Sequence, residues 1–104
     1  MAVTRELAQK ETEEVITTFA PLEIILENRA KTHGDFGSHA AITQAIKADM
    51  SCQSSYSSLH EHQRESLEMI AHKIGRILAG DPDFRDHWDD IAGYAKLSAD
   101  RCTK

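Results

Sequence analysis

The apolar residues of the chain recur every three or four positions, which is the spacing of one side of an α-helix. The clearest series lies between residues 58 and 79. It consists of Leu67, Ile70, Ala71, Ile74, Ile77 and Leu78. Ser58 and Glu61 match the Ser-x-x-Glu capping box at the start of this helix, and Gly80 suits its end. We therefore predict a long amphipathic helix in this part of the chain.

The same spacing predicts two more helices around this one. A helix over residues 82–101 has Asp81 as its cap and Pro82 at its first position, where a missing N–H is tolerated. Its predicted buried residues are Phe84, Trp88, Ile91, Ala95 and Cys102. A helix over residues 38–50 is predicted to bury the side that carries Ile42, Ala45, Ile46 and Asp49.

The N-terminal region, residues 4–32, is also predicted to be helical, although Pro21 interrupts it. One kinked helix and two shorter helices fit this region equally well, and Gly34 is a natural stop. No segment alternates apolar and polar residues, and no internal repeat is present. We expect a single all-α domain over residues 1–104, a four- or five-helix bundle, in which residues 1–26 can form a separate kinked helix.

Charge and composition exclude several classes of function. The net charge is −5 and no extended basic tract is present, so we expect no binding to a nucleic acid polymer. No apolar run approaches the roughly 18 residues of a membrane-spanning helix, and the first residues lack the apolar core of a signal peptide. Cys52 and Cys102 lack zinc-type spacing. We expect a cytoplasmic protein. A domain this small buries only about 60–70% of its unfolded surface, so we also expect a homodimer.

Two pairs of acids stand on the two predicted C-terminal helices. Glu65 and Glu68 are neighbours on one helix, and Asp86 and Asp90 are neighbours on the next. They form either solvated surfaces, with contacts along the series Glu68, His72 and Arg76, or one cluster around Mg²⁺ or Mn²⁺, which prefer oxygen ligands. In an antiparallel pair Glu68 and Asp90 meet more easily than Glu65 and Asp86. A complete cluster therefore needs an offset between the helices or a second subunit.

Several other groups are candidates for substrate contact. Lys73 and Arg76 follow the first acidic pair on the same helix and could meet phosphate oxygens. His33 and Asp35 stand in a loop with two glycines, which is either a ligand-binding loop or a plain turn with Asp35 as a helix cap. Gly93 allows close approach, either by another helix or by a ligand. No recognisable catalytic nucleophile is present.

Three segments carry a resemblance to known proteins. They are His33-Gly34-Asp35-Phe36, the run from Glu65-Ser-Leu-Glu68 to Lys73-Ile-Gly-Arg76, and Asp86-His-Trp-Asp-Asp90-Ile-Ala-Gly93-Tyr94-Ala. Over residues 27–101 the chain resembles small phage and prophage proteins without an assigned function. More distantly, it is similar to the all-α MazG-like nucleoside triphosphate pyrophosphohydrolases.

The MazG-like resemblance implies a Mg²⁺ (or Mn²⁺) ion, a (deoxy)nucleoside triphosphate substrate and release of pyrophosphate by an attacking water. The implied metal ligands are Glu65, Glu68, Asp86 and Asp90, and the implied substrate contacts are Lys73, Arg76, His33 and Asp35. The chain departs from the family pattern at Arg64, where a glutamate is expected, and in the second motif, which has no glutamate. These departures also fit a catalytically silent relative. The alternative function is a non-enzymatic, phage-derived helical module that binds a protein partner through an exposed apolar patch.

Overall fold

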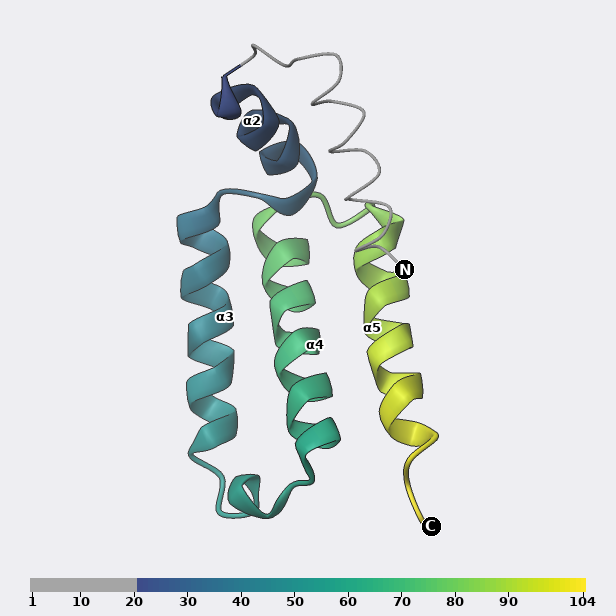
Figure 1. The fold of residues 1–104 in the computed structure, drawn as a ribbon. Helices are drawn as coiled ribbons and strands as arrows, with labels where there is room; N and C mark the ends of the chain where they lie inside the picture. The colour runs from purple at the N-terminus through teal and green to yellow at the C-terminus, as the bar shows by residue number, and fades with distance from the viewer. Residues whose placement is uncertain (1–20) are drawn as a thin grey trace.

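The computed structural model describes residues 21–104, and this part of the chain is helical (Figure 1). Its elements are α2 (Leu22–His33), α3 (Phe36–Ser51), the short 3₁₀ helix η1 (Tyr56–Ser58), α4 (Glu61–Ala79) and α5 (Arg85–Ala99). With four α-helices and no strand in residues 21–104, the all-α prediction is confirmed for this range. The helix predicted before Pro21 lies outside the described residues. Within residues 21–104, no helix is both long enough and apolar enough to cross a lipid bilayer.

The turn between α2 and α3 follows the sequence signals. Gly34 ends α2 with a φ of 80°, a conformation that only glycine adopts without strain. Asp35 then caps α3, because its carboxylate accepts hydrogen bonds from the Ser38 backbone N–H at 3.0 Å and from the Ser38 hydroxyl at 3.2 Å. The helix predicted to begin at Ser38 therefore begins at Phe36.

Two predicted helix starts are wrong in detail. The capping box of α4 joins His60 and Gln63, whose side-chain oxygen accepts from the His60 N–H at 2.9 Å, while Ser58 belongs to η1. Asp81 caps only a local turn, by accepting from the Asp83 N–H at 2.9 Å. As a result, α5 begins at Arg85, with Phe84 as its N-cap, and Pro82 stands before the helix.

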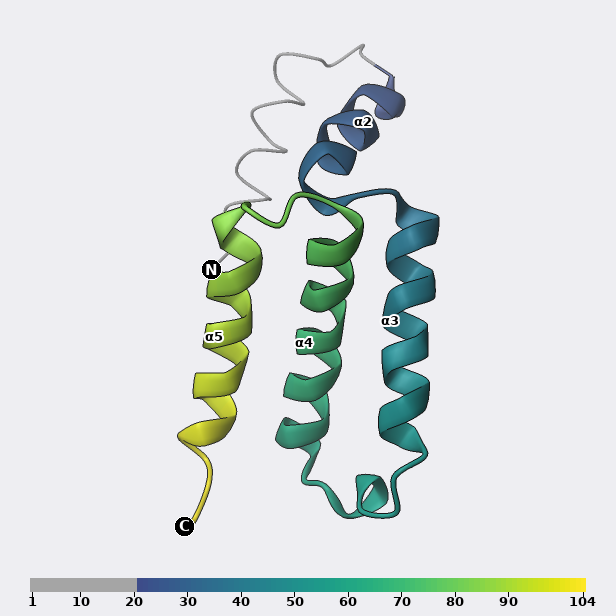
Figure 2. The same ribbon diagram turned by 180° about the vertical axis from the view of Figure 1, so that it is seen from behind.

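Helices α3, α4 and α5 lie side by side with α4 in the middle (Figures 1 and 2). The contacts of α4 show why. Ser66 and Lys73 touch α5, whereas Gly75 lies against His39 and Thr43 of α3. At about 100° per residue these two sets stand on nearly opposite sides of α4. The three helices therefore form a single layer, with α3 and α5 separated by α4.

A single layer cannot bury the predicted apolar stripes completely. Ala71 is the one fully buried apolar side chain among the described residues. Leu67 is 40% exposed, Trp88 is 53% exposed and Leu78 is 67% exposed. Cys102, Ala45 and Asp49 are exposed as well. The prediction that these residues are buried is wrong, because no helix of residues 21–104 lies over either side of the layer.

At the end of the layer next to α2, the α2–α3 turn and the α4–α5 turn are joined by close backbone contacts. The carbonyl oxygen of Thr32 accepts from the Asp81 N–H at 3.2 Å and is 2.8 Å from His87 Nε2, which donates to it. A Cβ atom built on Gly34 would lie 2.3 Å from the Ala79 backbone. Glycine is therefore required where the α2–α3 turn meets the end of α4.

Gly34→Ala should lower the free energy of unfolding by about 2 kcal/mol or more, because it combines a positive φ with a backbone overlap. Gly93→Ala is the matched control. A Cβ at Gly93 meets nothing within 4 Å, and Gly93 lies inside α5. That substitution should therefore raise stability by up to about 1 kcal/mol. Urea denaturation of both variants checks the pair, and equal effects at the two glycines would contradict the contact.

Candidate functional site

The layer formed by α3, α4 and α5 has two sides of different chemistry. Glu65, His72 and Arg76 share one side of α4 at helical spacing. Because α5 runs antiparallel to α4, its residues Asp86 and Asp90 flank this same side, as does Lys47 on the edge of α3. We call this side the polar face and define it by Lys47, Glu65, His72, Arg76, Asp86 and Asp90. It contains half of the predicted site residues, namely Glu65, Arg76, Asp86 and Asp90.

A buried ion pair lies at the centre of the α4–α5 contact. The Lys73 ammonium is 2.9 Å from a carboxylate oxygen of Asp90, and the two side chains are 3% and 13% exposed. Removing two charges from water is costly, so such a pair is stable only while both partners are present. Lys73 thus neutralises one of the carboxylates predicted to bind metal. It is also too buried to offer its ammonium to a phosphate in solvent.

Asp86 stands one turn before Asp90 on α5 and is also buried, at 7% exposure. Since Asp90 is level with Lys73, the antiparallel arrangement sets Asp86 close to the level of Arg76, which is partly buried. Two carboxylates and two cations therefore follow each other along the same stretch of the α4–α5 contact. Burial of charged groups in so small a protein is unusual and marks this stretch as a candidate functional site.

One chain does not bring the four predicted metal ligands together. The Ser98 hydroxyl donates to the Ser66 hydroxyl at 2.6 Å, so Glu65 is level with the end of α5. Asp86 precedes Ser98 by twelve residues, which is about 18 Å along the helix at 1.5 Å per residue. Glu68 instead contacts the Tyr56 hydroxyl at 3.5 Å, on the side of η1. Within residues 21–104, no group of three or more His, Cys, Asp or Glu side chains is close enough to hold a metal ion. The four-carboxylate metal site stays a prediction.

Two histidines that the sequence analysis did not include among the site residues lie where α3 meets α4. The rings of His39 and His72 are 5.8 Å apart, and His39 Nε2 is 3.2 Å from the His72 carbonyl oxygen. Burial lowers the pKa of both imidazoles from the ordinary value of 6.5. Positive charges of nearby cations lower it further, those of Arg76 and Lys73 on α4 for both rings and that of Lys47 on α3 for His72. Cations of α3 and α4 therefore lie close to both rings, beside the carboxylates of Asp86 and Asp90.

The four-residue spacing of polar side chains on α3 is the sequence pattern that points to His39 and Lys47. His39, Thr43 and Lys47 follow each other at four-residue spacing and so share one edge of α3. Thr43 on that edge is 1% exposed, which places the whole edge against α4. The predicted inward side of α3 included Ile42 and Ile46 and stopped short of this polar edge.

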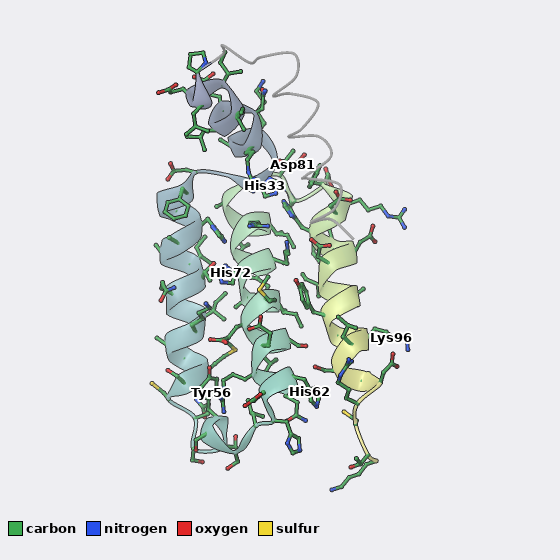
Figure 3. The ribbon with its side chains drawn as sticks, viewed as in Figure 1. His33, Tyr56, His62, His72, Asp81 and Lys96 are labelled. Atoms are coloured by element: carbon green, nitrogen blue, oxygen red, sulfur yellow. The ribbon has the colours of Figure 1, made fainter. Side chains whose placement is uncertain are left out.

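The loop residues His33 and Asp35 lie apart from the polar face and have structural contacts. Asp35 is the N-cap of α3, so the structure agrees with a plain turn in which this residue caps the helix. His33 Nδ1 is 2.6 Å from the Thr32 hydroxyl, and its ring packs against Phe84 and His87. His33 lies near Asp81, where α2 meets the α4–α5 turn (Figure 3). The contacts of His33 join the two turns. Substrate contact by His33 or Asp35 stays a prediction.

Fold and site together define a small all-α protein whose helical layer has one polar and one apolar side. The chain belongs to the family DUF6378, a domain of unknown function, which matches residues 18–102. This membership agrees with the resemblance to proteins without an assigned function, and it provides no link to MazG-like enzymes or to phage proteins. No curated protein and no solved structure matches the chain.

Asp90→Asn should lower the free energy of unfolding by about 3 kcal/mol, because it leaves the Lys73 charge buried without its counter-ion. Asp89→Asn is the matched control. Asp89 pairs with Arg85 on the surface of α5, where both side chains are more than half exposed. It should lower stability by less than about 1 kcal/mol. Thermal and urea unfolding of both variants measure the difference, and equal losses would show that the buried pair has no special weight.

Stability should fall as the pH drops below about 6.5, the ordinary histidine pKa. The folded state holds His39 and His72 with lowered pKa values, so the unfolded chain binds more protons in this range. The groups that face the two rings are Lys47 on α3, Lys73 and Arg76 on α4, and His87 on α5. His72→Gln keeps the backbone oxygen that His39 contacts and should flatten the dependence. Melting temperatures measured from about pH 8 to about pH 5 test this, and an unchanged slope in the variant would contradict it.

Proposed function

We propose that the polar face binds the phosphates of a (deoxy)nucleoside triphosphate, and that the protein is a MazG-like, Mg²⁺-dependent nucleotide pyrophosphohydrolase or a catalytically silent relative of that group. The observation that carries the proposal is the gathering of cations around His39 and His72, beside two buried aspartates. Lys47 comes from α3, while Lys73 and Arg76 come from α4. Ammonium and guanidinium groups are the donors that commonly bind phosphate oxygens.

Each cation has a different part in this proposal. Lys47 and Arg76 are partly buried on the polar face, where ammonium and guanidinium groups can donate charge-assisted hydrogen bonds to phosphate oxygens. Lys73 is held by Asp90 and acts through its charge and by fixing α4 against α5. A neutral His72 imidazole can accept or donate one hydrogen bond, and the lowered pKa of His72 keeps it neutral near pH 7.

The predicted Mg²⁺ ion depends on where the four carboxylates lie along the helical layer. The carboxylates of one chain do not fit a Mg²⁺ ion held by Glu65, Glu68, Asp86 and Asp90 together, since their positions along the layer differ too much. Mg²⁺ commonly binds through one or two carboxylates and the phosphates of the substrate. The proposed role of the protein side chains is therefore to bind and position the nucleotide.

Arg76→Gln and Lys47→Gln should each weaken nucleotide binding at least about tenfold, the usual loss for a hydrogen bond to a charged group. Arg85→Gln is the control, because Arg85 is exposed and lies off the polar face of α5. Isothermal titration with a panel of nucleoside triphosphates, with and without Mg²⁺ or Mn²⁺, measures the affinities. Pyrophosphate release, measured in the same samples, separates an active enzyme from a silent relative.

No binding of any nucleotide under these conditions would contradict the proposal. Equal losses in the Arg85 and Arg76 variants would also contradict it, because general electrostatic attraction would then account for the binding.

The opposite side of the layer supports the second candidate, a non-enzymatic module, of phage origin in our reading, that binds a protein partner. Its supporting observation is the exposure of large apolar side chains such as Leu67, Leu78 and Trp88. This function requires neither metal nor nucleotide. It predicts that Mg²⁺ and nucleotides leave the melting temperature unchanged, whereas the first candidate predicts an increase with ligand concentration.

A further inference from the structure

We propose that the Phe36 side chain is the surface on which the base of a bound nucleotide stacks, so that the polar face accepts nucleotides with little preference between bases. The inference rests on the proposed function, because it adds a base contact to a ligand whose phosphates bind to Lys47 and Arg76. Phe36 is the first residue of α3 and is not among the residues predicted to contact substrate.

Phe36 lies on the same side of α3 as Lys47. The two positions are eleven residues apart, which is three full turns and about 20° at about 100° per residue. Along the helix axis they are about 16 Å apart, at 1.5 Å per residue. Both side chains therefore border the polar face, with Phe36 at the end next to α2 and Lys47 further toward η1.

Arg76 stands nearly level with Phe36 on the neighbouring helix. A Cβ on Gly34 would overlap the carbonyl group of Ala79, so the start of α3 and the end of α4 lie at the same level. Arg76 precedes Ala79 by three residues and Phe36 follows Gly34 by two, which sets each of them about 3–5 Å further into the layer. The polar face thus presents an aromatic ring beside a guanidinium group, and an ammonium group beyond them.

The Phe36 ring is open to solvent and stands beside charged groups. It is 80% exposed, the highest value among the large apolar side chains of residues 21–104. Its ring centroid is 6.4 Å from that of His39, with 66° between the planes, an edge-to-face contact that orients the ring. Burial and the nearby charge of Arg76 lower the pKa of His39, so the guanidinium is close to the same imidazole. An exposed aromatic ring therefore adjoins the groups proposed to bind phosphate.

Stacking is the base contact that these surroundings favour. The polar side chains next to Phe36, those of Asp35 and Ser38, are hydrogen-bonded to each other in the cap of α3. A base on Phe36 would cover apolar ring surface that otherwise faces water, while the phosphates extend toward Arg76 and Lys47. Stacking depends little on which base is present, because every base has a π face. The expected ligands are therefore nucleoside triphosphates as a class.

The test compares nucleoside triphosphates with inorganic tripolyphosphate, which has the phosphates and no base. In isothermal titration of the full chain, Phe36→Ala should weaken the binding of each nucleoside triphosphate by about fivefold to a hundredfold, the loss of one stacked base. Its affinity for tripolyphosphate should stay within about twofold of the wild type. Phe36→Trp keeps an aromatic face and should restore nucleotide binding. The wild type should bind the four common triphosphates within about tenfold of one another.

Leu78→Ala is the matched control. Leu78 is 67% exposed and lies on the opposite side of the layer, so its removal should change neither affinity. Both positions are mostly exposed, and both alanine variants should keep the circular dichroism of the wild type. A measurement on the wild type adds a readout without substitution. Saturation-transfer NMR should show the base protons of the nucleotide in closer contact with the protein than the sugar protons.

The outcomes separate this inference from the proposed function. Equal losses of tripolyphosphate and nucleotide binding in Phe36→Ala would overturn the base contact, as would nucleotide binding that the substitution leaves unchanged. Base protons without saturation transfer, or a strong preference for one base, would overturn it too. In each of these cases Arg76→Gln still tests the phosphate site, because it should weaken both ligands. Absence of binding by tripolyphosphate and by every nucleotide would overturn the proposed function itself, and this inference with it.

Discussion

The position of α4, with a neighbour on each of two opposite sides, determines most other features of this protein. Its α3 side approaches closely enough that a Cβ on Gly75 would lie 2.4 Å from the Thr43 hydroxyl. Its α5 side is fixed by the Lys73–Asp90 pair. With both lateral sides occupied, no other helix of residues 21–104 runs along the remaining two sides of α4, one polar and one apolar. Sheets commonly divide a protein into two chemically different faces, and here three helices do the same.

Polar contacts hold the two lateral sides together, which is uncommon for helices in a small domain. Between α4 and α5 the contacts include Ser66 with Ser98 and Lys73 with Asp90. Between α3 and α4 they include His39 with the backbone of His72. Hydrogen bonds and ion pairs are directional, so these contacts fix the register of the helices more than they add net stability.

The sequence predicts the helices well and their environment less well. Spacing alone placed α4 within a few residues, and Gly34 and Asp35 fixed the α2–α3 turn, because capping is a local effect. The prediction of burial failed at Leu78 and Trp88. A periodic series of apolar residues shows that a helix has an apolar side, but it does not show what covers that side. The acids illustrate the same limit. Glu68 and Asp90 suit one cleft by sequence, yet the register set by Ser66 and Ser98 and the contact to Tyr56 separate them.

The carbonyl oxygen of Thr32 has a consequence for the order of folding. Its partner His87 is 55 residues further along the chain, and the His87 side chain is almost fully buried. Helices α3 and α4 form through local contacts, but this contact must wait until α5 has closed a long loop, whose entropic cost grows with loop length. The acceptor is a backbone atom, so any residue at position 32 supplies it. The specificity of this late step therefore resides in the single imidazole at position 87.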